Sequence, residues 1–338
     1  MSKVSIIVPI YNVEKYVEKC LKSLTSQTFN DIEIFAVSDG SPDNSGEIVK
    51  RLAQQDSRIK YLEKENGGYG SVLEYALEKI ESDYFMICDP DDWLSNNAVE
   101  KLVETLETNS VDMVVGCKYL VYNDNDEEVY TDSVIHSVNI NTEFNIVYND
   151  LSSFYYLDPS PHAKLYKTEL CKGIKLPHKV SFTDLLLYIY ALENAKKAIY
   201  INDALSYYLV DRPGNSMSTF KDKTFYDHYV IMRELFKYAD RGDTKLLYAR
   251  TYIQFRYALS QLKDNGQDSA KVKYFNEYWN IFKVLIKHKQ DVIDNYPKDG
   301  TLSKMKCEFL LSGLFEKAML KDLMGANNYE SKCNSSCL

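Results

Sequence analysis

The chain has 338 residues, of which 45% are hydrophobic and 26% charged, and its formal net charge is −9. This length and composition are typical of a soluble protein with two domains, or with one domain and a helical appendage. The negative charge argues against nucleic acid as a partner, because a nucleic-acid-binding surface needs an excess of lysine and arginine.

Cysteine usage and hydropathy bear on the compartment. Seven cysteines are scattered without metal-ligand spacing, which is typical of a reducing environment, so we expect a cytoplasmic protein. No signal peptide is recognisable, and no apolar stretch reaches the roughly 20 residues that span a bilayer, so contact with the inner face of the membrane would be peripheral. Four cysteines lie among apolar residues and are expected to be buried free thiols: Cys20, Cys88, Cys117 and Cys171.

Strand and helix patterns alternate through the first 122 residues. Apolar, β-branched runs predict buried strands at 4–9, 32–37, 59–63, 84–88 and 112–122. Apolar residues at helical spacing predict helices at 13–24, 46–55, 72–80 and 95–107. This alternation predicts an α/β fold with a mainly parallel, doubly wound sheet and helices on both faces.

The pattern changes beyond residue 122. We expect a strand at 129–137, a short helix at 142–151 and a substrate-covering region at 158–218. Only helices are predicted after residue 220, at 226–238, 245–262, 273–289 and 302–324. We therefore predict an α/β domain over 1–220, divided into the segments 1–122 and 123–220, a helical region over 221–326 and a disordered tail over 327–338.

The polar segments of the α/β domain all follow strands. Tyr11, Asp39, Asn66 and the run 89–92 each come shortly after an apolar run. Ligands of such sheets bind outside the carboxyl ends of the strands, which lie at one edge. The sequence therefore predicts that these segments converge there.

Three carboxylates occupy four positions after the fourth strand. Asp89, Asp91 and Asp92 repel one another unless a cation lies between them, and Mg²⁺ or Mn²⁺ prefers such oxygen ligands together with substrate phosphates. The alternative is a polar turn that caps the following helix.

Several motifs together resemble those of the family 2 glycosyltransferases. They are, in order, 5–12 (SIIVPIYN), 38–41 (SDGS), 66–68 (NGG), 89–93 (DPDDW), 164–167 (KLYK) and 182–186 (FTDLL). The resemblance is close over roughly the first 120 residues. It implies a GT-A fold and an inverting enzyme that uses a nucleotide-diphosphate sugar.

The resemblance also implies a nucleotide-sugar site within residues 1–122. Asp39 would accept a hydrogen bond from the base, usually uracil, and the backbone around Pro9 and Tyr11 would form a wall of that pocket. Ser38 stands where the family usually has a second acidic residue. Further contacts with the nucleotide sugar are implied for Asn66, Gly67, Gly68, Asp89, Lys164 and Arg212. For single glycines an ordinary turn, and for Lys164 pairing with a carboxylate, are the alternatives.

The resemblance assigns the chemistry to two acidic positions. Asp89 and Asp91 would hold Mn²⁺ or Mg²⁺ against the diphosphate. Within residues 123–220, the acceptor and catalytic segment, Asp184 would be the base that deprotonates the acceptor hydroxyl. Thr183 replaces the family's preceding glutamate and could cap the helix, and a first-turn residue favoured by the helix dipole is the alternative for Asp184.

Two further side chains are candidates for acceptor binding. His162 stands where the family often has tryptophan, and Trp93 follows the carboxylate run. A lone histidine is as often structural.

The resemblance thus implies a metal-dependent inverting glycosyltransferase. It would transfer a hexose or N-acetylhexosamine from a UDP-sugar to a hydroxyl of a growing glycan, lipid-linked or protein-bound, of a surface polysaccharide or glycoprotein. The C-terminal helices would form a core, bind acceptor or membrane surface, or make a homo-oligomer. The alternatives are a non-catalytic nucleotide- or glycan-binding protein and a sugar-phosphate nucleotidyltransferase, although the latter's glycine- and arginine-rich loop is absent after the first strand.

Overall fold

A computed structural model describes residues 2–122, 127–134, 146–210, 212, 222–241, 244–265 and 273–297 of the chain. The described residues fall into two compact units, one ending at Arg212 and the other comprising residues 222–297. The predicted domain boundary after residue 220, the predicted helix 302–324 and the predicted tail lie outside the described residues.

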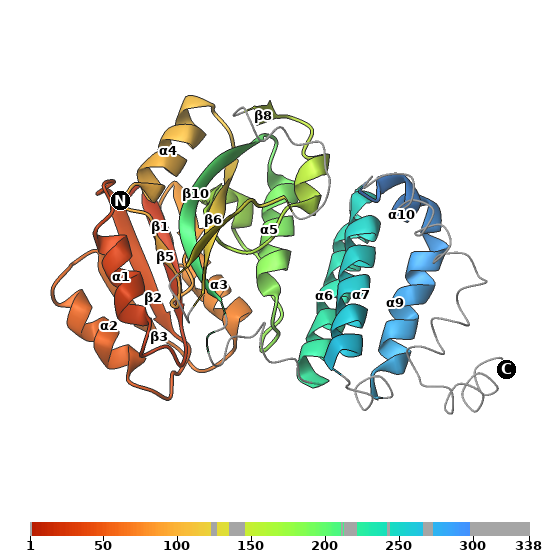
Figure 1. The fold of residues 1–338 in the computed structure, drawn as a ribbon, viewed down its shortest axis with the longest axis horizontal. Coiled ribbons are helices and arrows are strands. Elements are labelled where there is room, and N and C mark those ends of the chain that lie inside the picture. The colour runs from red at the N-terminus through yellow and green to blue at the C-terminus, as the bar shows by residue number, and fades with distance from the viewer. Residues whose placement is uncertain are drawn as a thin grey trace. The chain divides into compact units, whose positions relative to one another are not determined.

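The first unit is an α/β structure built on one mixed sheet (Figure 1). Its strands are β1 (Val4–Ile10), β2 (Ile32–Ser38), β3 (Ile59–Glu63), β4 (Tyr84–Ile87), β5 (Trp93–Leu94), β6 (Met113–Tyr122), β7 (Glu128–Thr131), β8 (Val147–Tyr148), β9 (Lys164–Lys167) and β10 (Ala198–Val210). Its helices are α1 (Val17–Thr25), α2 (Ser45–Ala53), α3 (Tyr69–Leu77), α4 (Ala98–Thr108) and α5 (Thr183–Asn194).

The sheet has the strand order β3-β2-β1-β4-β9-β6-β10-β5. The pairs β3–β2, β2–β1 and β1–β4 are all parallel. Ile6 of β1 lies opposite Ile34 of β2 on one side and Met86 of β4 on the other. Strand β9 runs antiparallel to both β4 and β6, whereas β6 and β10 are parallel. The predicted mainly parallel α/β fold is confirmed.

Helices cover both faces of this sheet (Figure 1). On one face, α1, α2 and α4 bury their apolar sides in a common core with the strands. In α1 the buried residues recur at the spacing of one helix face: Val17, Cys20, Leu21 and Leu24. On the other face, α3 packs against β1 and β2 and contacts α5. The four cysteines predicted to be buried free thiols are buried and free.

One expectation for the middle of the chain is wrong, and two strands there were not predicted. Val147–Tyr148 forms the strand β8, and a 3-10 turn follows over Ser152–Tyr156, so residues 142–151 do not form one helix. In the described part of 158–218, the predicted substrate-covering region, β9 and β10 are strands of the sheet that the sequence did not predict, and the covering role stays a prediction. Strand β10 has register shifts between Tyr200 and Ser206, and this irregularity breaks the alternation by which strands are recognised.

The second unit is helical throughout its described residues. It contains α6 (Asp222–Arg241), α7 (Leu246–Asn265), α9 (Phe275–Lys287) and α10 (Lys289–Asn295), which match the predicted helices at 226–238, 245–262 and 273–289. In α9 the buried side chains Tyr278, Ile281, Phe282 and Leu285 recur at helical spacing and face a core. Within the described segments of the chain, no helix is long and apolar enough to cross a membrane.

Candidate active site

Asp39 shapes the base-binding end of the predicted nucleotide site. Its carboxylate, 3% exposed, accepts hydrogen bonds from the backbone N–H groups of Gly67 (2.9 Å) and Gly68 (2.7 Å). Lys64, which the sequence did not single out, donates to the same carboxylate at 2.7 Å. Asp39 therefore holds the glycine turn in place. Its Oδ1 accepts two hydrogen bonds and its Oδ2 accepts one, so a lone pair remains on Oδ2.

The neighbouring loops lie at the same edge of the sheet. Asn66 donates through its side-chain amide to the backbone oxygen of Asp39 at 3.0 Å. Pro9 is buried in β1, whereas Tyr11, directly after that strand, is 50% exposed. The backbone N–H of Asp39 donates to the oxygen of Ile10 at the end of β1 at 2.9 Å, so the loops after β1, β2 and β3 converge.

Gly68 sits where a side chain does not fit. Its φ of 83° and ψ of 172° fall in a region that is essentially restricted to glycine, and an added Cβ would lie 2.9 Å from the backbone N and Cα of Lys179. The glycine therefore lets the turn pack directly on the segment before α5. This is a steric reason for glycine at this position, beside any contact with a nucleotide.

We expect Gly68→Ala to lower the free energy of unfolding by about 2–4 kcal/mol, from backbone strain plus the clash. Gly173→Ala is the matched control, since Gly173 also has a positive φ (75°) but nothing within 4 Å of an added Cβ. Denaturant unfolding of both variants measures the difference. Equal losses would mean that the approach of Lys179 does not constrain Gly68.

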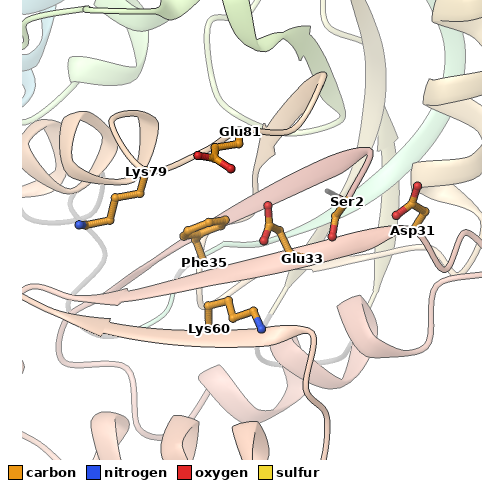
Figure 2. Close-up of a pocket in the computed structure, with 7 residues that line it drawn as sticks. All are labelled: Ser2, Asp31, Glu33, Phe35, Lys60, Lys79 and Glu81. Atoms are coloured by element: carbon orange, nitrogen blue, oxygen red, sulfur yellow. The ribbon is translucent and has the colours of Figure 1, made fainter.

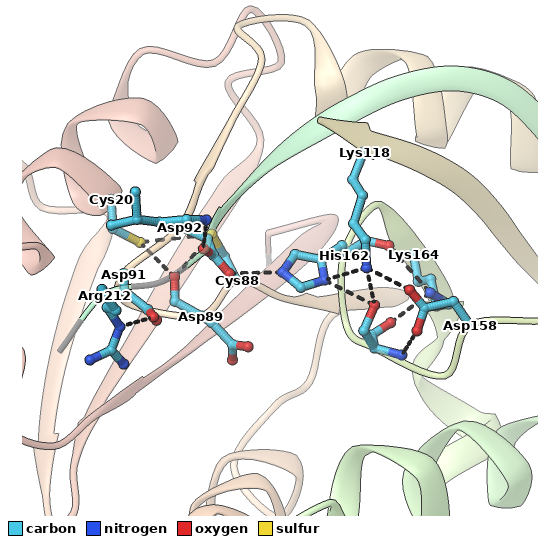
Figure 3. A network of polar contacts seen from close by, with 12 residues as sticks. Cys20, Cys88, Asp89, Asp91, Asp92, Lys118, Asp158, His162, Lys164 and Arg212 are labelled. Atoms are coloured by element: carbon cyan, nitrogen blue, oxygen red, sulfur yellow. Dashed lines mark hydrogen bonds and ion pairs between the residues drawn. The ribbon is translucent and has the colours of Figure 1, made fainter. Parts of the chain in front are cut away.

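The carboxylates after β4 lie in one electrostatic cluster (Figure 3). The Tyr69 hydroxyl donates to Oδ1 of Asp89 at 2.8 Å, and Arg212 Nε donates to Oδ2 of Asp91. Burial, and next the charge of Asp91, raises the pKa of Asp89 to about 7, with a further contribution from Asp184. Tyr69 was missed from the sequence, although it directly follows the glycine turn.

This donor set suits a divalent cation. Asp89 and Asp91 are hard oxygen donors, and their mutual repulsion is the kind that a Mg²⁺ or Mn²⁺ ion relieves. Among the described residues, Asp89, Asp92 and His162 also bring potential ligand atoms within 4.8 Å of one another.

Asp184 occupies the first turn of α5. The residue before the helix, Phe182, has a left-handed backbone (φ 64°) and makes no side-chain cap. The sequence suggested that Thr183 could cap this helix. It does not, because its hydroxyl is buried without a hydrogen-bond partner. Burial raises the pKa of Asp184 to about 6, although the N–H of Leu185 hydrogen bonds to the carboxylate and opposes this rise.

His162, Lys164 and Trp93 each have contacts within the protein. His162 is 8% exposed and bonds Asp92 at 2.8 Å through Nε2. Lys164 is fully buried and donates to the backbone oxygen of Ser160 at 2.6 Å. Trp93 has the Lys19 ammonium 3.1 Å from its ring centroid and stacks on Tyr207 with the ring centroids 5.4 Å apart. Contact of Lys164 with the nucleotide sugar and of Trp93 with the acceptor stay predictions.

A surface hollow of about 500 Å³ lies at the other end of the strands (Figure 2). Its lining includes Asp31, which directly precedes β2, and Lys60 near the start of β3. Ligands of such sheets bind at the carboxyl ends of the strands, so this hollow is not the candidate active site.

Known proteins match both the sequence and the fold. The family model "Glycosyl transferase family 2" matches residues 5–174. Glycosyltransferase GlyG of Streptococcus pneumoniae is 33% identical over 64% of this chain and 73% of its own length. The chain belongs to glycosyltransferase family 2.

Two other relatives of this family 2 chain match over about a third of their own length. Glycosyltransferase GlyA of Streptococcus pneumoniae is 33% identical over 65% of the chain, and the uncharacterized glycosyltransferase EpsJ of Bacillus subtilis is 43% identical over 34%. These matches span only 32% and 33% of the relatives' own lengths. The crystal structure of S. aureus TarS 1–349 with UDP-GlcNAc has the same fold, with a TM-score of 0.68 and 23% identity over 98% of this chain and 92% of that one.

Proposed function

We propose that this family 2 chain is a metal-dependent, inverting glycosyltransferase that transfers a hexose or N-acetylhexosamine from a UDP-sugar to a hydroxyl of a glycan. The observation that carries the proposal is the cluster of three carboxylates. Asp89 and Asp91 follow β4, Asp184 begins α5, and the charges of the other two both raise the pKa of Asp89. All three carboxylates are half-buried, and like charges gathered with a perturbed pKa are typical of binding and catalytic sites.

The donor end of the site rests on the Asp39 turn. The Asp39 carboxylate would offer its Oδ2, which accepts only the N–H of Gly68, to the base, and the glycine turn that this carboxylate holds would lie beside the nucleotide. Solved structures of TarS, which has this fold, contain UDP-GlcNAc and UDP. A uridine nucleotide is therefore the donor class that we propose.

Asp89 and Asp91 would hold the divalent cation, Mn²⁺ or Mg²⁺. Bound there, the cation supplies positive charge beside the diphosphate as it departs. Arg212, which already pairs with Asp91, would add a second positive charge at the same place.

Asp184 would act as the base. As the acceptor oxygen attacks the anomeric carbon, its proton passes to the Asp184 carboxylate, and the bond from that carbon to the phosphate oxygen breaks with the electron pair leaving on UDP. Attack opposite the leaving group inverts the anomeric configuration. A pKa of about 6 leaves Asp184 ionised at neutral pH yet more basic than an exposed aspartate.

This assignment predicts the pH dependence of transfer. The base must be ionised, so the rate is lost as the pH falls through the pKa of Asp184, which is about 6. With saturating Mn²⁺ and donor, which keep Asp89 ionised, we expect log kcat/KM for the acceptor to fall by about one per pH unit below that value and to be level above it. Initial rates at constant ionic strength measure the profile. A flat profile down to about pH 5 would exclude Asp184 as the base.

Calorimetric titration of UDP and a panel of UDP-sugars tests the proposed function, first with Mn²⁺ and then with EDTA, followed by an assay of donor hydrolysis. We expect metal-dependent binding of UDP and fastest hydrolysis of one UDP-sugar. The absence of UDP binding in the presence of Mn²⁺ would contradict the proposal.

Family membership favours this function over a nucleotidyltransferase. The glycan acceptor, the domain roles, peripheral contact with a membrane and self-association through the C-terminal helices stay predictions.

A further inference from the structure

A buried chain of hydrogen bonds leads from β6 to the carboxylate loop (Figure 3). Lys118 Nζ lies 3.0 Å from Ser160 Oγ, which lies 2.9 Å from His162 Nδ1, and His162 Nε2 lies 2.8 Å from Asp92 Oδ2. Lys118, His162 and Asp92 are 7%, 8% and 2% exposed. Polar groups buried this deeply are costly unless each is paired, so the arrangement is under strong geometric constraint.

The Lys118 ammonium decides between the two possible directions of the protons. It only donates, so Ser160 Oγ accepts from it, and because it also lies 3.5 Å from His162 Nδ1, that nitrogen is placed as an acceptor, to which the Ser160 hydroxyl donates. The proton of the neutral imidazole then resides on Nε2 and is donated to Asp92. The hydrogen-bond network thus assigns the tautomer of His162.

Asp92 joins this chain to the end of β10. Its other oxygen, Oδ1, accepts the backbone N–H of Leu209 at 2.8 Å. Leu209 is three residues before Arg212, and Arg212 pairs with Asp91, the neighbour of Asp92 in the sequence. Both Asp92 oxygens therefore fasten the loop after β4 to surrounding elements.

We infer that His162 is a positioning residue, whose Nε2–H holds Asp92 and thereby fixes Asp89, Asp91 and Arg212 in the arrangement that binds metal and diphosphate. This inference rests on the proposed function. It assigns His162 neither to the acceptor, as the sequence suggested, nor to the metal. A ligating nitrogen needs a free lone pair, but Nε2 bears the proton, and Nδ1 accepts from Ser160 with the Lys118 ammonium 3.5 Å away.

Two substitutions separate positioning from direct ligation. His162→Gln keeps an N–H donor near the Nε2 position, whereas His162→Phe keeps a ring of similar size without any donor. We expect Mn²⁺-dependent binding of UDP, measured by calorimetry, to weaken about tenfold in His162→Phe and less than threefold in His162→Gln. The control is His288→Gln, in the other unit, which alters another His–Asp pair and should leave binding unchanged.

Each result of this comparison bears on the inference. Wild-type affinity in His162→Phe would overturn it, because the donor would then be dispensable. Equal losses in the Gln and Phe variants would also overturn it, because the imidazole itself would be required, as for a metal ligand. Absence of UDP binding by the wild type would contradict the proposed function.

The tautomer is tested without any nucleotide. Nitrogen-15 NMR of histidine-labelled protein resolves the ring nitrogens, and the spectrum of His162→Gln identifies His162 among the five histidines. We expect the proton on Nε2, with no ligation shift when Mg²⁺ is added. A proton on Nδ1 or a Mg²⁺-induced ligation shift would overturn the inference even if His162→Phe fails to fold.

Discussion

Asp184→Asn is expected to lower kcat by about 100- to 10,000-fold and to leave the binding of UDP unchanged. The amide has nearly the shape of the carboxylate but cannot accept the acceptor proton. Burial already disfavours the charge of Asp184, as its raised pKa shows, so the variant should be at least as stable as the wild type at neutral pH. Rates with donor and acceptor, calorimetry with UDP and thermal unfolding measure the three quantities.

Asp203→Asn is the matched control, because Asp203 is 44% exposed in β10 and pairs only loosely with Lys101 at 3.8 Å. It should retain wild-type turnover. If Asp184→Asn also retained turnover, Asp184 would not be the base, and its alternative role as a first-turn residue of α5 would hold. A non-catalytic binding protein would show no turnover in either variant or in the wild type, with UDP binding intact.

The parallel half of the fold could be predicted because its information is local. Strands such as β1 are buried on both faces and read as continuous apolar runs, while α1 and α4 show their buried sides at helical spacing. Strand β10 was not predicted, because its bulged stretch around Asn202 and Asp203 interrupts the apolar pattern. The two-residue strand β5 is too short for any periodicity.

The site could be predicted as a set of loops but not as a set of contacts. The rule that ligands bind at the carboxyl ends of strands placed Asp39 and Asp89 at one edge. The hydrogen bond from His162 to Asp92 joins residues that are 70 positions apart in the sequence. The two residues meet because β9, which follows His162, pairs antiparallel with β4, and no local sequence pattern predicts this pairing. Likewise, the sequence left two roles open for Lys164, contact with the nucleotide sugar or pairing with a carboxylate, and only the fold shows that this lysine is fully buried.

Asp91→Asn should reduce the affinity for UDP in the presence of Mn²⁺ by about 10- to 100-fold and make the remaining binding insensitive to EDTA. The amide keeps an oxygen donor but removes the charge that attracts the cation. Calorimetry with and without Mn²⁺ measures both effects. Asp112→Asn is the control. Asp112, which directly precedes β6, pairs with Lys167, so removing its charge should lower the stability of the protein but leave the metal dependence of UDP binding intact.

Arg212 offers a competing explanation that the same measurement can separate. Arg212 pairs with Asp91. Under the competing explanation, Asp91→Asn weakens UDP binding solely because it releases Arg212, with no effect on a metal ion. Arg212→Met should weaken UDP binding while preserving the requirement for Mn²⁺, because the carboxylates that would hold the cation remain. If Arg212→Met instead removed the metal dependence as fully as Asp91→Asn, and the double variant lost nothing more, Asp91 would serve Arg212 and not the metal. Retained metal dependence in Arg212→Met, together with its loss in Asp91→Asn, would identify Asp91 as the metal ligand.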